Sequence, residues 1–556
     1  MKLIRTLLYS SILVLGACES FLDSEPLTEK NSTTYFANAD EANEALVGCY
    51  DVLQHIYDVG VGTPLAATVM SDLCFGGTGD NDPDNFKMID EFDLSVYPTG
   101  NNEFEDNWEK FYVGIFRCNS LLLGLNNVDW EGDTVTQGAI EAEAKFLRSY
   151  FYFDLVRLFE KVPLLKIPTS GIVAQAHQDS TYKLITNDLL FAINNLGDDP
   201  YNSSSLTNFG HATKWAAESM LARVFLFYTG YYNKETLPSS NGGVTQAQVY
   251  EFINDVVENS GHGLIDNYYD LWPAAANYAA AVAKKPISEN TYAGETHKEV
   301  VFSIKYTYTS TWGSGDYEGN IDGNHWMVMN GIRLQTIKKY GYGYGWGAAT
   351  VLPTVYEEWD ENDDRRSASI MAVAEEKLGY KEIESVKEYT GYFTKKYTPL
   401  ADASGDHTTD GYGEGSFMIS QYQDYFVIRY ADVLLMAAEL ELYQGNNAKA
   451  LDYVNTVRYR ANADSLTTID KAQLFDERKH ELAFEGVWYF DMLRYDHTLE
   501  YAANLVNCEV DVLSGGDPVT KTVKGDNLKA TRGLCAIPHN QITLSNGVYT
   551  QNTGWE

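Results

Sequence analysis

The sequence predicts a mainly α-helical fold, in which tetratricopeptide-like helical hairpins form the scaffold and long loop and β-hairpin insertions form a ligand-binding face. Three observations predict it. Apolar residues recur with helical spacing towards both ends of the chain, small residues stand where neighbouring helices would meet, and two long segments rich in Gly, Asn and Asp follow no helical period. The 556 residues, 44% of them hydrophobic and 21% charged, suit a folded chain with an ample core.

The first residues have the pattern of an export signal, so we do not expect them to be part of the fold. Two basic residues precede an apolar stretch over 7–17, which is shorter than the roughly 20 residues that a membrane-spanning helix needs. The stretch ends in LGAC, which resembles the signal of bacterial lipoproteins. We therefore predict a signal peptide over 1–17 and a lipidated Cys18 with a tether over 18–38. An ordinary cleaved signal with a coincidental cysteine is the alternative.

Helical periodicity is clearest over 139–159, where apolar residues recur at steps of three and four and predict one buried face. Alanines such as Ala216 and Ala437 would let helices approach closely, as in tetratricopeptide hairpins. The helix starts do not keep the roughly 34-residue period of a regular repeat, so we expect a few hairpins interrupted by long loops. The other predicted helices cover 39–56, 104–123, 182–196, 212–228, 249–259, 427–443 and 447–461.

Two insertions, 71–102 and 306–346, interrupt the helical pattern. Both are rich in Gly, Asn and Asp, and the second is also rich in Trp and Tyr, a mixture that helical packing does not explain. A β-prone run over 299–308 suggests that hairpins support the aromatic loop. We expect function to reside in these insertions, because binding residues concentrate on loops held by a rigid scaffold.

The second insertion has the composition of a sugar-binding site. A sugar ring offers a face of C–H bonds and a rim of hydroxyls, so its site needs a flat aromatic ring beside hydrogen-bonding side chains. Glycines between these residues allow sharp turns. Burial of the two tryptophans as loop plugs is the alternative. The predicted glycan-binding residues of this insertion are Trp312, Asp316, Tyr317, Asn320 and Trp326. The later run GYGYGWG lacks the lysine of a phosphate-binding loop, so we expect Tyr342, Tyr344 and Trp346 to form an aromatic edge, with simple burial of these rings as the alternative.

The first insertion carries acidic residues at the spacing of a calcium loop. Asp80, Asp82, Asp84 and Glu91 occupy positions one, three, five and twelve of that pattern, although Asn85 stands where such loops have glycine. We keep calcium as a candidate cofactor, with a solvated acidic loop as the alternative.

Charge and cysteine content narrow the classes of partner and site. The chain has 78 acidic and 41 basic residues, a formal net charge of −37, so its field repels nucleic acid. No cysteine spacing is typical of zinc, and an exported chain would allow a disulfide such as Cys508 with Cys535.

Seven segments in order resemble the SusD (RagB) family of outer-membrane nutrient-binding lipoproteins, over nearly the whole mature chain. Each alone is an amphipathic pattern of low specificity, but their order and spacing together are specific. Val487 departs from the family, which commonly has a basic residue there. The matching segments are CESFLD, EAEAKFLRSYFYFDLVRLFEKVPLL, HATKWAAESMLARVFLF, FVIRYADVLLMAAELE, VNTVRYRAN, DERKHELAFEGVWYFDMLRY and IPHNQITLSNGVYTQNTGW.

The resemblance implies a cell-surface lipoprotein of the outer membrane that docks on a SusC-like TonB-dependent transporter, captures an oligo- or polysaccharide, and has no catalytic activity. It implies that Phe75, Asn81 and Tyr97 of the first insertion join the glycan site, because the family also draws on this loop. It divides the chain into an N-terminal SusD-like region over 39–290 and a C-terminal RagB/SusD-like region over 291–556. Membrane contact would come through the lipid anchor only.

Two other functions remain open from sequence alone. No metalloprotease, serine-hydrolase or zinc motif is present, yet a glycosidase carboxylate pair cannot be recognised by counting in so acidic a chain. Glu481, Glu485 and Arg494 lie on apolar helices and are expected to brace the core. The second alternative is a transporter-associated lid for peptide or other nutrient uptake, in which the aromatic loops would face protein.

Overall fold

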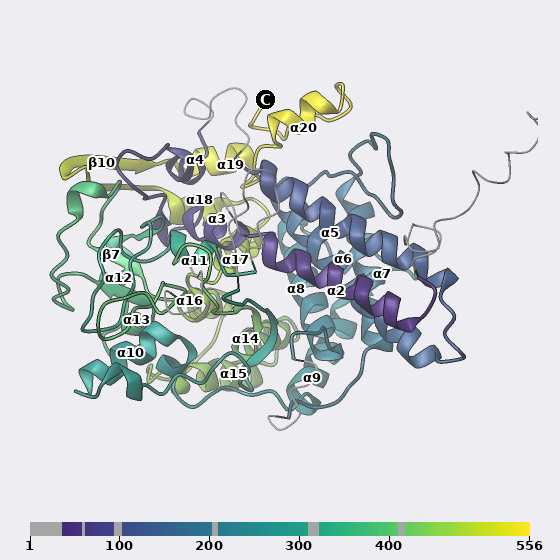
Figure 1. Ribbon diagram of the computed structural model, residues 1–556, viewed down its shortest axis with the longest axis horizontal. Coiled ribbons are helices and arrows are strands. Elements are labelled where there is room, and N and C mark those ends of the chain that lie inside the picture. The colour runs from purple at the N-terminus through teal and green to yellow at the C-terminus, as the bar shows by residue number, and fades with distance from the viewer. Residues whose placement is uncertain (1–35, 58–61, 94–102, 203–208, 310–321, 410–416) are drawn as a thin grey trace, which may run out of the picture.

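The computed structural model describes residues 36–57, 62–93, 103–202, 209–309, 322–409 and 417–556 (Figure 1). Long helices fill the right side of this view, whereas short helices, small sheets and irregular segments fill the left. The predicted mainly helical architecture is confirmed. Among the described residues, no helix combines the length and the apolarity that crossing a bilayer requires.

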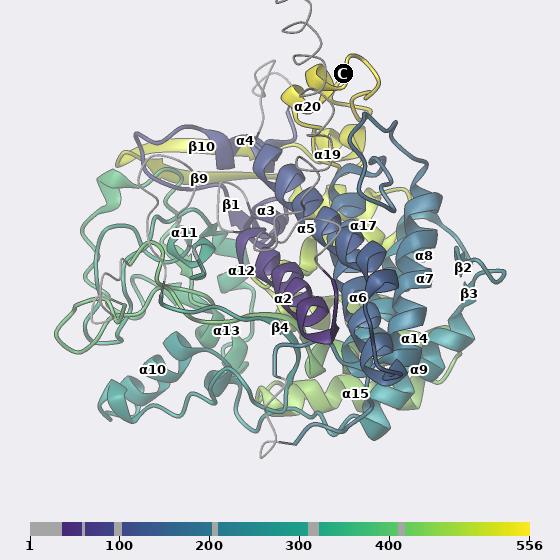
Figure 2. The same ribbon diagram turned by 45° about the vertical axis from the view of Figure 1, so that its right-hand side comes forward.

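The N-terminal helices form an array in which each helix packs on its neighbour in the chain (Figure 2). α14 and α15 extend this array, because α14 packs on both α9 and α15. All the helices that the sequence predicts are present, with ends shifted by a few residues. The helices of the array are α2 (Ala39–His55), α5 (Glu105–Gly124), α6 (Thr134–Phe159), α7 (Gln178–Asn195), α8 (Lys214–Tyr232), α9 (Gln246–Asn259), α14 (Tyr430–Tyr443) and α15 (Asn447–Arg460).

The central helix α6 differs from its prediction in how it is buried. Asp133 caps its N-terminus by accepting a hydrogen bond from the Thr136 amide at 3.0 Å, and the helix ends at Glu160, whose φ is 57°. From Phe146 to Phe159 almost every side chain is buried, because α5, α7 and α2 all pack on this helix. The expectation of a single buried face is therefore wrong for the second half of α6.

The C-terminal helices fold back onto the array, where α17 packs against α8. These helices include α16 (Lys471–Leu482) and α17 (Trp488–Tyr495). The remaining helices are short and lie mostly in the irregular half. They are α3 (Thr63–Val69), α4 (Asn85–Glu91), α10 (Pro273–Val282), α11 (Trp326–Met329), α12 (Pro353–Glu357), α13 (Asp364–Ser369), α18 (Glu500–Val506), α19 (Gly525–Thr531) and α20 (His539–Leu544), with 3-10 turns η1 (Leu125–Asn127), η2 (Tyr268–Leu271), η3 (Ile287–Glu289) and η4 (Ile383–Ser385).

Four small antiparallel sheets complete the described structure. The β-prone run at 299–308 does contain a strand, β4 (Val300–Ile304), but its partner is β8 (Tyr425–Arg429) rather than a neighbouring hairpin strand. The predicted hairpin is therefore wrong here, since the pairing joins segments far apart in the chain. The other sheets are β1 (Cys74–Phe75), β5 (Thr350–Val351), β7 (Tyr392–Thr394) and β6 (Ile370–Ala372) in the order β1-β5-β7-β6, β9 (Cys508–Ser514) with β10 (Asp517–Val523), and β2 (Thr236–Leu237) with β3 (Val244–Thr245).

A buried network of ion pairs ties the C-terminal half together. Arg429 is fully buried and contacts Glu299, Glu481 and Glu485 at 2.7, 2.9 and 2.7 Å. Arg494 pairs with Glu439 at 2.6 Å. The expectation that Glu481, Glu485 and Arg494 brace the core is confirmed, because each is buried and bonded to an opposite charge.

The cysteines do not form the disulfide that the sequence allowed. Cys508 and Cys535 both carry free thiols, and the Cys535 Sγ lies 3.9 Å from the Sδ of Met70. The other described cysteines, Cys49, Cys74 and Cys118, are also free and buried.

Candidate functional site

The two insertions meet in the structure. β1 of the first pairs with β5, directly after the second, and the Thr78 amide donates to the Gly347 carbonyl at 2.8 Å. The Arg333 guanidinium bridges them, because its Nη1 lies 3.3 Å from Asp82 Oδ2 and donates to the Trp346 carbonyl at 3.1 Å. Residues more than 250 positions apart thereby share one surface region.

Within the second insertion, the described residues on the two sides of 310–321 meet at one point, which we call the neck. The Thr307 amide donates to the Asp322 carbonyl at 2.9 Å. Asn324 is fully buried, and its side-chain amide donates to the Gln423 carbonyl at 2.8 Å. Its backbone amide donates to the Gln421 carbonyl at 2.6 Å. The neck is thus held against the segment that leads into β8.

Trp312, Asp316, Tyr317, Asn320, Tyr97 and the lipidation residue Cys18 lie outside the described residues. Asn81 is described and exposed, between Gly79 and the Arg333 partner Asp82, so it stays a candidate for ligand contact.

Trp326 and Phe75 are corrections to the predicted glycan site. The Trp326 side chain is only 4% exposed, and its ring packs against Tyr397 and Tyr425 at centroid distances of 4.7 and 5.6 Å. Phe75 is 1% exposed in β1. Neither ring has a face free for a sugar, because both fill the core beneath the insertions. The alternative reading of Trp326 as a plug is the correct one.

Two exposed tyrosines flank the neck, and sequence reasoning had not singled them out. Tyr308 is 43% exposed and Tyr422 is 36% exposed, with ring centroids 6.5 Å apart and planes at 87°. We call them the tyrosine pair. Tyr422 lies outside both insertions, and no sequence pattern singles it out. In the structure its neighbours Gln421 and Gln423 are buried while Tyr422 is exposed.

The predicted aromatic edge at 342–346 is partly wrong. Tyr342 is fully buried and donates to Glu376 at 3.1 Å. Tyr344 and Trp346 are half-buried, and Tyr344 contacts the His407 ring at a centroid distance of 4.4 Å. Tyr342 therefore does not belong to an aromatic edge, whereas Tyr344 and Trp346 keep partial exposure.

Two carboxyl groups near the tyrosine pair, those of Glu295 and Asp424, have raised pKa values. Lys305 forms an ion pair with Asp424, which also accepts the Tyr306 amide at 3.1 Å. Burial raises the pKa of Glu295 to about 8, and repulsion from Asp424 adds to the shift. Burial also raises the pKa of Asp424 to about 6, against the attraction of Lys305. At neutral pH Glu295 therefore keeps its proton and acts as an uncharged support.

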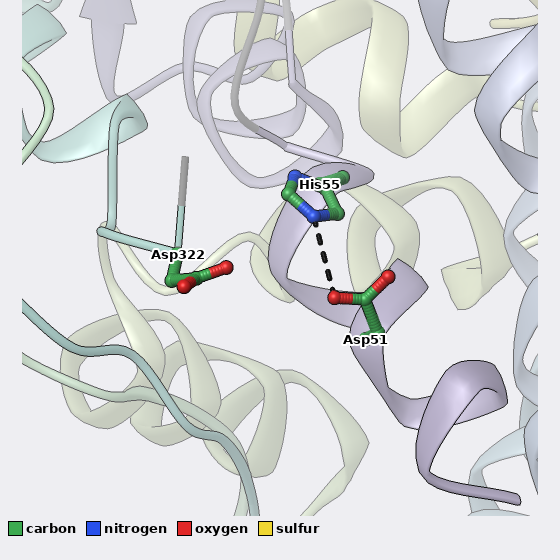
Figure 3. Close-up of side chains that lie close together, drawn as sticks. All are labelled: Asp51, His55 and Asp322. Carbon is green, nitrogen blue, oxygen red and sulfur yellow. Dashed lines mark ion pairs between the residues drawn. The ribbon is translucent and has the colours of Figure 1, made fainter. Parts of the chain in front are cut away.

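Figure 3 shows a second titratable cluster, formed by Asp51 and His55 of α2 with Asp322 at the neck. One ligand atom from each lies within 4.8 Å of the others, an N/O donor set that suits a divalent cation. Arg117 already contacts Asp51 at 2.6 Å, so a cation would compete with a guanidinium. Hydrogen bonding to His55 first, and then to Arg117, lowers the pKa of Asp51 to about 2.

The structure does not assemble the predicted calcium loop. α4 begins at Asn85, so the second half of the proposed twelve-residue loop is a helix. Three of the four carboxylates have separate cationic partners: Asp82 pairs with Arg333, Asp84 with Lys387, and Glu91 with Lys521. The fourth, Asp80, does not join them in a cluster. The four carboxylates therefore do not form one cluster in the described structure, because protein cations neutralise three of them at different places.

Two family models match the chain. The model described as "SusD family" matches residues 286–555, and the model described as "Starch-binding associating with outer membrane" matches residues 21–226. Among curated proteins, a SusD-like protein of Bacteroides ovatus is 24% identical over 522 residues, which cover 89% of this chain and 84% of that protein.

Solved structures show the same similarity. A laminarin-binding SusD-like protein is 27% identical and superposes with a TM-score of 0.71, covering 93% of this chain and 99% of its own. Surface glycan-binding protein A from Bacteroides thetaiotaomicron, in complex with laminarihexaose, shares the fold at 20% identity and a TM-score of 0.71, with 92% and 99% covered.

Proposed function

Since the chain belongs to the SusD family, we propose that it captures an oligo- or polysaccharide at the cell surface and delivers it to a TonB-dependent outer-membrane transporter, without catalysis. The names of its relatives support a glycan ligand, because one binds laminarin and another was solved with laminarihexaose. Both ligands are uncharged glucose polymers. A neutral glycan also suits a chain whose net charge is −37.

The observation that carries the proposal is the tyrosine pair at the neck. The partly exposed rings of Tyr308 and Tyr422 offer stacking surfaces, and the partly exposed Lys305, close to Tyr308 in the chain, offers a hydrogen-bond donor. By analogy with base stacking, each ring contributes about 1–3 kcal/mol, so the site yields modest affinity after the costs of association. Weak and reversible capture suits a protein that passes its ligand on.

The same proposal includes attachment to the outer membrane through a lipid anchor and a transporter as the partner protein. Lipidation at Cys18 would hold the chain on the outer membrane, since several acyl chains make release negligible. A Cys18→Ser variant should appear in the soluble fraction after cell disruption. Persistence of this variant in the outer-membrane fraction would argue against the lipid anchor. A SusC-like transporter is the expected partner in a pull-down from outer membranes.

The test of glycan binding is calorimetry with laminarihexaose on the chain from Glu19 onward. Replacing both Tyr308 and Tyr422 by alanine should weaken binding at the neck at least tenfold, because the stacking faces are lost. Tyr443→Ala is the matched control, since Tyr443 is 49% exposed on α14. Equal affinity of the double variant and the wild type would remove the tyrosine pair from the site.

The two rival functions give other results in the same assays. A glycoside hydrolase would release reducing ends from laminarin, whereas a binding protein leaves the polymer intact. A peptide-uptake lid would lose its transporter in the pull-down when the tyrosine pair is replaced, and would show no glycan binding at all.

A further inference from the structure

A groove of about 890 Å³ opens between η2 and the C-terminal end of α15, away from the neck. The segment before η2, the start of α13 and the last turn of α15 form its walls. α13 and α15 lie below α11 in both views, which are related by a turn about the vertical axis (Figures 1 and 2). Its volume is within the range of pockets that bind small ligands, and no site residue discussed so far lines it.

Tyr459 stands at this groove with an unusual exposure. Its side chain is 81% exposed, the highest value for a large apolar residue among the described part of the chain. Its hydroxyl has no hydrogen-bond partner within that part of the chain. An aromatic ring that is open to water on a helix surface presents a full stacking face. Tyr269 supplies a second, half-buried ring to the same groove.

Hydrogen-bond acceptors line the same groove. Asn462 donates its side-chain amide to Asp364 at 2.5 Å, which leaves the Asn462 Oδ1 open to a ligand. Asp266 is fully exposed, with Lys298 Nζ no closer than 3.8 Å. The one arginine in the lining, Arg460, is committed to Glu299 and Glu481. The groove therefore offers acceptors and an aromatic face, but no uncommitted guanidinium for an anion.

We propose that this groove is a second saccharide-binding site, which takes a neutral sugar. A pyranose ring would lie on Tyr459, and its hydroxyls would donate to Asp266, Asp364 and Asn462. Anionic sugars would meet the carboxylates of Asp266 and Asp364, and the cation beside Asp266, Lys298, is already paired with that carboxylate. A basic peptide is the competing ligand, because a cation can also sit on a tyrosine face between carboxylates. The inference does not depend on the tyrosine pair, since the two sites share no residue.

Two variants test the groove on the chain from Glu19 onward. Tyr459→Ala removes the stacking face, and Thr456→Trp fills the groove from the exposed side of α15 while keeping Tyr459. Tyr443→Ala is the control. The probes are laminarihexaose, maltohexaose and mannohexaose, with tetralysine for the basic alternative, each titrated by calorimetry.

The expected result is that at least one hexasaccharide binds the wild type and the control, and that both groove variants weaken this event at least tenfold. Binding that persists when Tyr308 and Tyr422 are replaced, yet depends on Tyr459, belongs to the groove. Whether the neck binds a glycan is measured separately, with the variant in which both Tyr308 and Tyr422 are replaced by alanine. The proposal is overturned if no hexasaccharide shows a Tyr459-dependent event, or if only tetralysine does.

Discussion

Individual carboxyl groups of this protein occupy two opposite electrostatic environments. Burial would raise the pKa of Glu481, but Arg460, Arg429 and Arg365 outweigh it and hold that pKa at about 2. Glu295 has no such set of cations, and burial raises its pKa to about 8. The first kind of group stabilises the fold at neutral pH, whereas the second costs stability whenever it is forced to ionise.

Removing the charge of Glu481 should be among the most damaging single changes. Glu481→Gln leaves Arg429 and Arg460 short of a buried partner, so we expect a loss of about 3–5 kcal/mol in the free energy of unfolding. Urea unfolding at pH 7 measures it. Glu251→Gln, on the exposed face of α9, should change stability by less than about 0.5 kcal/mol. Equal effects of the two variants would contradict a structural role for the network.

Glu295 should make stability fall as pH rises. Its folded pKa, about 8, lies above the ordinary value of 4.5, so the folded state holds a proton that the unfolded state releases between these values. Glu295→Gln removes this loss. Between pH 5.5 and 8.5 the free energy of unfolding of the wild type should fall by about 1–3 kcal/mol more than that of the variant, as measured by urea unfolding. Parallel pH profiles would show that Glu295 ionises normally.

The array and the C-terminal helices approach closely where glycine leaves room. A Cβ atom at Gly230 of α8 would lie 2.4 Å from the Arg494 carbonyl oxygen of α17, whereas at Gly138 of α6 the nearest contact would be an ordinary 3.4 Å. The close contact between α8 and α17 joins the N-terminal array to the C-terminal helices. Such contacts also explain why the sequence predicted the helices but not their partners.

This difference predicts opposite signs for the same substitution. Gly230→Ala should lower the free energy of unfolding by about 1–3 kcal/mol, because α8 and α17 must separate. Gly138→Ala should gain up to about 1 kcal/mol, since alanine favours the helix. Thermal or urea unfolding of both variants checks the pair. A gain for Gly230→Ala would mean that the contact yields without strain.

The whole molecule carries a field that should select among glycans. With a net charge of −37, it should bind a sulfated laminarin oligosaccharide at least tenfold more weakly than its neutral parent in dilute buffer. The gap should narrow at high salt, because the charges are screened over about 10 Å at 0.1 M. Calorimetry at two salt concentrations tests this. Tighter binding of the sulfated form would reveal a local cationic patch.

The sequence by itself determined those features that depend on the spacing and composition of residues close together in the chain. The spacing of apolar residues placed α2, α5–α9, α14 and α15, and composition marked the two insertions and the acidic surface. Tertiary structure alone decided which aromatics face water, which strand pairs with β4, and which cations neutralise Asp82 and Asp84 of the first insertion. The reason is that exposure and pairing depend on segments remote in the chain. Trp326 is buried by Tyr397 and Tyr425, and Tyr422 is exposed beside Tyr308, and no local pattern records either contact.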